Sequence, residues 1–137
     1  MGKYPDNLYY TKTHEWAKVD GDVVTVGITS YATEELGEVT RIVLPEVGKK
    51  VQFGDPFGEI ESYKSCSELF SPVSGVIIEK NMDIEDPDKG GKGRLDLISE
   101  DPYGRGWLIK IKATNLSGDL RRLMTSEEYS KMLEQES

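Results

Sequence analysis

The stretch Glu59–Gly75 reads EIESYKSCSELFSPVSG and sets a single lysine between two β-prone runs. The first run covers Pro56–Glu61 and the second covers Leu69–Glu79, and the segment between them is short and polar. This arrangement predicts a β-hairpin that exposes Lys64 near its tip. Because small serines surround Lys64, its amine is available for the attachment of a covalent group.

Further β-prone runs lie on both sides of this hairpin. Asp20-Gly21 separates two of them and predicts a tight turn whose two central residues have positive φ. Ser30 is expected to cap a short helix that runs to Leu36 and ends at Gly37 in the left-handed conformation. Many short strands with regular turn signals predict a mostly β fold, either a sandwich or a flattened barrel.

Residues 107–112 predict one more strand, because apolar and polar positions alternate along them. We expect three side chains to be buried: Trp107, Ile109 and Ile111. We expect three others to face solvent: Leu108, Lys110 and Lys112.

Helices are expected at the C-terminus, in residues 117–135. Thr125 and Glu128 have the spacing of a capping box. Tyr129, Met132 and Leu133 follow at helical spacing and predict an apolar stripe. Before this region, residues 82–98 include the polar, glycine-rich run DPDKGGKGR at 86–94 and predict an extended flexible loop.

The composition limits the class of protein. The chain has 137 residues, so a single domain over 1–137 is expected. Its 17 basic and 25 acidic residues give a net charge of −8, which argues against nucleic acid or anionic membranes as partners. Cys66 is the only cysteine, which fits a reducing compartment. No apolar run is long enough to span a bilayer, and no signal peptide is recognisable. A cytoplasmic location is expected, or the mitochondrial matrix if a presequence was removed.

Four segments in order resemble the glycine cleavage system H protein family. The hairpin is similar to the family's lipoylation hairpin, in which Glu-Ser-Val-Lys is followed by small or acidic residues, an aromatic residue and Ser-Pro-Val-Ser-Gly. The other three segments are HEW at 14–16, VGITSYA at 26–32 with LGE at 36–38, and DPYGRGWLIKIK at 101–112. Together they cover most of residues 9–133.

The resemblance implies a lipoyl-domain-like fold, a barrel-sandwich hybrid with short helices at the edge and the C-terminus. It implies lipoate attached covalently to Lys64, and a carrier with no catalytic residues of its own. Thr13, Glu15 and Glu68 match family residues of a cleft that shelters the loaded arm. In that cleft, carboxylates would hold the cationic amine of the carried group and exclude water.

The resemblance also implies the partners. The lipoyl-lysine arm would shuttle an aminomethyl group and reducing equivalents between a glycine decarboxylase, an aminomethyltransferase and a dihydrolipoyl dehydrogenase. A lipoate ligase or lipoyl transferase would attach the cofactor, and the carrier would be a monomer.

Several alternatives stay open at this point. The chain could be an H-like lipoate-binding protein of another pathway, such as sulfur oxidation with a heterodisulfide-reductase-like complex. The segment at 81–99, Cys66 and Ser99 depart from the family pattern and leave that option open. Biotin is the rival modification, but biotin domains usually place methionines beside the lysine. A module without any modification, and an enzyme that uses Lys64 as a Schiff-base nucleophile, are the remaining hypotheses.

His14 and Cys66 each call for a structural or a functional interpretation. His14 is the only histidine, so a histidine-based metal site is not expected, and a hydrogen bond within the N-terminal hairpin is its expected role. Cys66 is interpreted as a small apolar filler. Its alternative role is exchange with the lipoyl disulfide, which needs exposure and a lowered thiol pKa.

Overall fold

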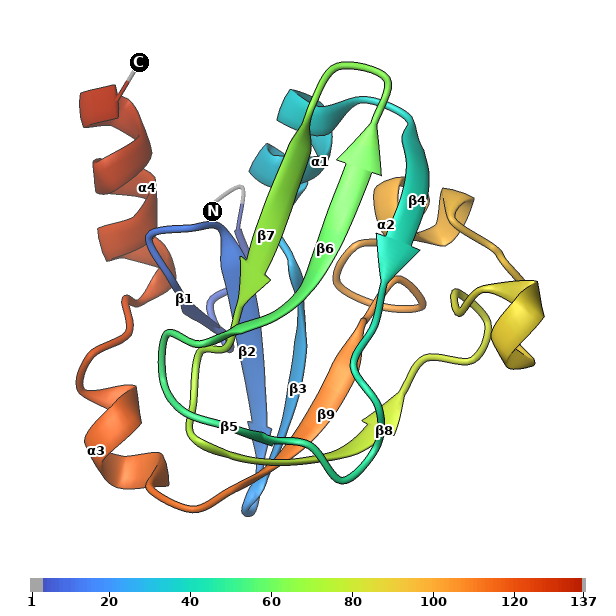
Figure 1. Ribbon diagram of the computed structural model, residues 1–137. Helices are drawn as coiled ribbons and strands as arrows, with labels where there is room; N and C mark the ends of the chain where they lie inside the picture. Colours follow the sequence, from blue (N-terminus) through green and yellow to red (C-terminus); the bar gives the residue numbers. More distant parts are fainter. Residues whose placement is uncertain (1–3, 137) are drawn as a thin grey trace.

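The computed structural model describes residues 4–136, so the first three residues and the last residue of the expected domain lie outside the described part. Two antiparallel sheets form the body of the fold (Figure 1). One has six strands in the order β1-β2-β3-β9-β8-β5 and the other has three in the order β4-β6-β7. The strands are β1 Tyr9–Tyr10, β2 Glu15–Asp20, β3 Val23–Ile28, β4 Val39–Val43, β5 Lys50–Val51, β6 Pro56–Ser62, β7 Cys66–Phe70, β8 Gly75–Lys80 and β9 Ile109–Ala113.

The helices are short and lie at the edges of the sheets, as Figure 1 shows. They are α1 Ser30–Leu36, the 3-10 helix η1 Pro87–Lys89, α2 Asp96–Glu100, α3 Leu116–Leu120 and α4 Ser126–Glu136. The prediction of a mostly β sandwich with short helices is confirmed, although the two sheets do not close into a barrel.

The core lies between the sheets and is made by alternate residues of the strands. Val24, Val26, Ile109 and Ile111 are fully buried on the six-stranded sheet, and Ile60 is 1% exposed on the three-stranded sheet. This alternation follows from the two-residue repeat of a strand, which places every second side chain on the same face. The shared core holds the three-stranded sheet, and therefore its hairpin, in a fixed position.

The predicted hairpin is formed by β6 and β7. Glu59 pairs with Glu68, Ile60 with Ser67, and Glu61 with Cys66. Its tip projects away from the body of the fold, beside α1 and the start of β4 (Figure 1). The strand that follows Lys64 starts earlier than expected, since β7 begins at Cys66 rather than at Leu69.

Two local predictions need correction. The turn between β2 and β3 is centred on Gly21 and Asp22, since Asp20 already pairs with Val23. Gly21 has φ +64°, whereas Asp22 is not in the positive-φ region, so only one central residue needs the glycine conformation.

The helix α1 is capped one residue earlier than predicted. Thr29 is its N-cap, and the Thr29 hydroxyl accepts a hydrogen bond from the amide of Ala32 at 3.3 Å. Gly37 ends the helix with φ 77° and ψ −143°, which has the expected positive φ but lies outside the left-handed helical region. The cap shifted because Thr29 is buried at the end of β3, where its hydroxyl reaches the first turn.

The C-terminal helix α4 begins with the predicted capping box. The Glu128 amide donates to the Thr125 hydroxyl at 3.2 Å, and the Glu128 carboxylate accepts from the Thr125 amide at 2.9 Å. Tyr129 is fully buried and stacks on Tyr10 with 4.8 Å between ring centroids. The helix therefore closes a second, aromatic-rich cluster at one end of the six-stranded sheet.

Segment 82–98, expected to be a loop, folds back on itself. The Lys92 amide donates to the Met82 carbonyl at 2.8 Å, and the Arg94 amide donates to the Asp83 carbonyl at 2.8 Å. The side chain of Ile84 is fully buried within it. These backbone bonds, η1 and the start of α2 give the segment a compact shape that glycine-rich composition alone does not reveal. Its mobility stays a prediction.

The alternation at β9 is confirmed at four of six positions. Ile109 and Ile111 are fully buried, while Lys110 and Lys112 reach solvent. Leu108 is also fully buried and Trp107 is only partly buried, because the strand begins at Ile109 and the two preceding residues do not follow its repeat. Over residues 4–136, no helix is long and apolar enough to cross a membrane.

Candidate functional site

Lys64 lies at the tip of the β6–β7 hairpin, where the sequence predicted it. The tip is closed by the Ser62 amide, which donates to the Ser65 carbonyl at 2.8 Å. The Ser62 hydroxyl accepts from the amides of Lys64 and Ser65, both at 3.2 Å. These bonds fix the backbone of the tip while the side chains of Lys64 and Tyr63 are exposed, the latter to 81%.

The amine of Lys64 is free of a carboxylate partner in the described residues, since none of the ion pairs between them includes it. Its side chain rests near the end of α1, where a Cβ on Gly37 would lie 3.6 Å from Cε and 3.9 Å from Nζ. Sequence reasoning missed this contact between the hairpin tip and the end of α1. Small neighbours and an exposed amine leave room for a bulky acyl group.

A hollow of about 290 Å³ lies between α1, the loop before β2 and the β7 leg of the hairpin. Its polar lining includes Thr13 and Glu68, and Ile28, Ala32 and Leu36 give it an apolar side. We call it the hairpin cleft. Ser65 and Ser67 also line it, so the cleft begins directly beside Lys64.

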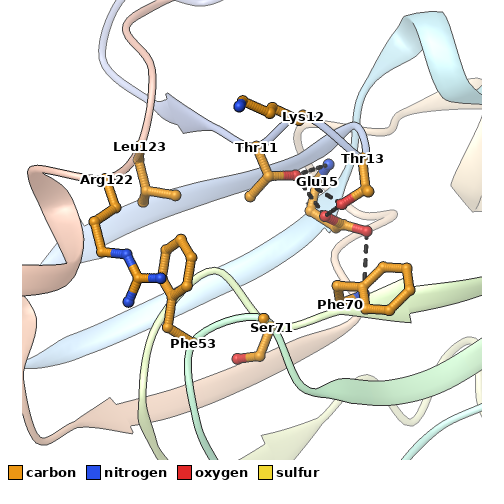
Figure 2. Close-up of a pocket in the computed structure, with 10 residues that line it drawn as sticks. Thr11, Lys12, Thr13, Glu15, Phe53, Phe70, Ser71, Arg122 and Leu123 are labelled. Atoms are coloured by element: carbon orange, nitrogen blue, oxygen red, sulfur yellow. Dashed lines mark hydrogen bonds between the residues drawn. The ribbon is translucent and has the colours of Figure 1, made fainter.

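Glu15 lies behind the wall of this cleft rather than in it. Its carboxylate accepts hydrogen bonds from the hydroxyls of Thr11 and Thr13 and, at 3.1 Å, from the amide of Phe70 (Figure 2). Glu15 therefore ties the turn before β2 to the end of β7, and it holds Thr13 at the edge of the cleft. Of the three predicted cleft residues, the structure brings Thr13 and Glu15 into direct contact, and Glu68 joins Thr13 only as part of the cleft lining.

Burial raises the pKa of Glu15 to about 7, although the hydrogen bonds that its carboxylate accepts act in the opposite direction. The side chain is 1% exposed, so the ionised form loses most of its hydration. Sequence reasoning did not foresee this burial, because a glutamate before a tryptophan carries no signal of depth.

Glu15 also faces a second hollow, of about 420 Å³, shown in Figure 2. We call it the Arg122 pocket. Its principal lining residues are Lys12, Glu15, Phe53, Phe70, Arg122 and Leu123.

His14 lines the hairpin cleft and takes part in a hydrogen-bond network that the sequence did not predict. Its Nδ1 lies 2.8 Å from the hydroxyl of Tyr129 on α4, and that hydroxyl lies 2.8 Å from the Thr29 hydroxyl. A hydrogen-bond partner for His14 was expected within the N-terminal hairpin, but the partner lies on a helix more than a hundred residues away. His14 has φ 74°, the one positive φ outside glycine in the described chain. The network connects the cleft to the first turn of α1 and to α4.

Cys66 is exposed on β7 near the hairpin tip, so its interpretation as a small apolar filler is wrong. Across residues 4–136, no group of three or more His, Cys, Asp or Glu side chains is arranged to hold a metal ion.

Comparison with known proteins assigns the chain to a family. The model of the glycine cleavage H-protein family matches residues 8–136. The chain belongs to the glycine cleavage H-protein family.

Curated relatives match over nearly the whole length. The glycine cleavage system H protein of Rubrobacter xylanophilus is 47% identical over 99% of both chains. The probable glycine cleavage system H protein of Thermococcus gammatolerans is 50% identical over 96% of this chain and 93% of that one. In the crystal structure of a glycine cleavage system H protein from Mycobacterium marinum, the fold agrees with a TM-score of 0.79 at 38% identity, over 93% of this chain and 97% of that one.

Members of the glycine cleavage H-protein family are carrier components of a multienzyme system rather than enzymes by themselves. This membership agrees with the resemblance drawn from the four sequence segments. It gives no support to a role in sulfur oxidation.

Proposed function

We propose that this chain is the lipoyl carrier of glycine cleavage and that Lys64 carries the lipoyl group. The observation that supports this most is the position of Lys64, exposed at the tip of a hairpin whose backbone is fixed by its own hydrogen bonds. A ligase or transferase needs such an amine, because the acyl group can reach it only when the amine is exposed.

The residues around Lys64 fit a long acyl chain. The amine has no carboxylate partner among the described residues, so acylation, which removes its positive charge, would break no ion pair. When bound, lipoate supplies a dithiol–disulfide pair that accepts a one-carbon amine unit and two electrons. The hairpin keeps the attachment point away from the core, and partner enzymes can therefore enclose the tip.

The hairpin cleft is proposed as the shelter for the carried group. Its apolar side, formed by Ile28, Ala32 and Leu36, would exclude water. Thr13 and the Glu68 carboxylate would face a cationic amine from the other side. Glu15 would act indirectly, because its carboxylate holds the Thr13 hydroxyl in place.

The proposed partners are the glycine decarboxylase, the aminomethyltransferase and the dihydrolipoyl dehydrogenase of glycine cleavage, together with the enzyme that attaches lipoate. In this scheme the chain contributes a fixed attachment point for a flexible arm and no catalytic group. Tethering gives the carried group a high effective concentration at each docked enzyme, which a free cofactor would lack.

Reconstitution of glycine–bicarbonate exchange tests this function. The fully lipoylated chain should support exchange by a glycine decarboxylase, and a Lys64→Arg variant should not. Lys89→Arg is the matched control, since Lys89 is another exposed lysine with no ion pair in the described part of the chain. Absence of exchange with a chain shown to be lipoylated would refute the role in glycine cleavage.

A second measurement tests the cleft. Glu68→Gln should shorten the lifetime of the carried one-carbon unit, because the variant removes a charge that holds its amine. Glu59→Gln removes an exposed carboxylate directly across the hairpin from Glu68 and should leave that lifetime unchanged. Equal lifetimes in all three proteins would refute the role of Glu68.

A further inference from the structure

The Arg122 pocket lies apart from the hairpin tip. It is formed by the turn before β2, the turn before β6, the end of β7 and the link between α3 and α4. Phe70, on its wall, lies six residues beyond Lys64, a separation of about 20 Å along the strand. Its volume of about 420 Å³ falls within the range of small-molecule sites. Of its lining residues, the proposed shuttle function uses only Thr13 and Glu15.

The pocket combines apolar walls with two cations. Phe53, Phe70 and Leu123 supply the apolar surface, and Lys12 and Arg122 supply the positive charges. Neither cation takes part in an ion pair among the described residues, although the chain carries a net charge of −8.

Arg122 is held in place before any ligand arrives. Its guanidinium lies over the ring of Phe53, 3.7 Å from the ring centroid (Figure 2). Stacking restrains one face of the guanidinium and leaves the N–H groups at its edge available, and these form no hydrogen bond with another described residue. A restrained guanidinium loses less entropy when it binds an anion.

The carboxylate of Glu15, at the floor of the pocket, does not occupy these cations. Its oxygens accept from Thr11, Thr13 and the Phe70 amide, so its hydrogen-bonding capacity is directed toward the protein. The Glu15 carboxylate therefore already has its hydrogen-bond donors, while the N–H groups at the edge of the Arg122 guanidinium and the ammonium of Lys12 stay available to a ligand.

We propose that the Arg122 pocket binds a small organic carboxylate with an apolar body, with the carboxylate against Arg122 and Lys12 and the apolar body against Phe53, Phe70 and Leu123. A purely inorganic anion would leave the apolar walls exposed, and a purely apolar ligand would leave the two cations unmatched. Lys64 is not among the residues that line the pocket.

Phenylacetate is a suitable probe, because it joins a carboxylate to a ring small enough for the pocket. Titration of the unmodified full-length chain, followed by amide chemical shifts, should give saturable changes at residues 11–13, 53–54, 70–71 and 122–123. Neutral phenylacetamide should bind roughly ten-fold more weakly, the usual effect of losing one charged hydrogen-bond partner.

Neighbouring arginines provide a matched pair of variants. Arg122→Gln should weaken phenylacetate binding roughly ten-fold. Arg121→Gln makes the same change in net charge on an adjacent exposed residue outside the pocket lining and should leave binding unchanged. Arg122→Lys should fall between them, because it keeps the charge and loses the planar donor pair.

Three results would overturn the proposal. They are the absence of saturable shifts up to roughly 10 mM phenylacetate, equal binding of phenylacetamide, and equal weakening by the Arg121 and Arg122 variants. All three measurements use the chain without lipoate. A negative result here would therefore refute only the carboxylate site, and a negative result in the glycine–bicarbonate exchange assay would refute only the carrier function.

Discussion

Replacement of Glu15 by glutamine is expected to change how the stability of the protein depends on pH. Burial raises the pKa of this carboxyl group from 4.5 to about 7 in the folded chain. Because the folded chain binds the proton more tightly than the unfolded chain, the stability associated with Glu15 is fully present below pH 4.5. It is lost as the pH rises through about 7.

The magnitude follows from the two pKa values. Each pH unit between them corresponds to about 1.4 kcal/mol, so ionisation of Glu15 costs the folded state about 3 kcal/mol at pH 8 relative to pH 4. Glutamine has the same shape and cannot ionise. Its carbonyl can accept from the Phe70 amide, while its NH₂ can donate to the hydroxyls of Thr11 and Thr13, and the hydrogen bonds at the site are kept.

Denaturant unfolding from pH 4 to pH 8 measures the effect. The free energy of unfolding of Glu15→Gln minus that of the wild type should rise by about 3 kcal/mol over this range. Glu59→Gln, at an exposed position on β6, is the control and should show a nearly constant difference. A difference for Glu15→Gln that stays constant, or that falls with rising pH, would refute the assignment of a raised pKa to this buried group.

Three further variants test the packing around the site. Gly27→Ala should lower the free energy of unfolding by about 2 kcal/mol, measured by chemical denaturation, because a Cβ there would lie 2.5 Å from Cζ2 of Trp16; an unchanged value would contradict this close packing. Thr125→Ala should lower it by about 1 kcal/mol with a loss of helical circular dichroism, since it removes the capping box with Glu128, and Thr125→Ser should restore most of both. Tyr129→Phe should cost about 1–3 kcal/mol in the same assay, because the buried hydroxyl bonds two side chains at 2.8 Å; a neutral effect would mean that the network adds nothing to stability.

Local sequence signals predicted the parts of the fold that depend on local chemistry. The capping box at Thr125 and the β-hairpin around Lys64 both appear as expected. In each case the structure is decided by residues within a few positions of one another. The position of Lys64 is therefore the part of the candidate site that the sequence predicted best.

Features that depend on distant contacts were beyond local patterns. Glu15 is buried where the Phe70 amide at the end of β7 donates to its carboxylate, and His14 bonds to Tyr129 on α4. The compact form of segment 82–98 similarly needs the burial of Ile84 against the rest of the core. A charged or glycine-rich stretch does not reveal which surface it will meet after folding.

The exposure of Leu108 was predicted wrongly for a related reason. The expected alternation was extended two residues before the strand begins, and the period of two applies only within a strand. Because Leu108 bonds through its amide to Val26 at 2.8 Å, its side chain packs into the core from a position that is not part of β9.

Intact-mass measurement of the native protein tests most directly whether the amine of Lys64 is the attachment point for lipoate. Protein produced in cells that synthesise lipoate should carry the mass of one lipoyl or octanoyl group. The Lys89→Arg control should carry it too, and Lys64→Arg should have the unmodified mass. An acylated Lys64→Arg variant, or a wild-type chain that stays unmodified beside an active lipoate ligase, would contradict the account.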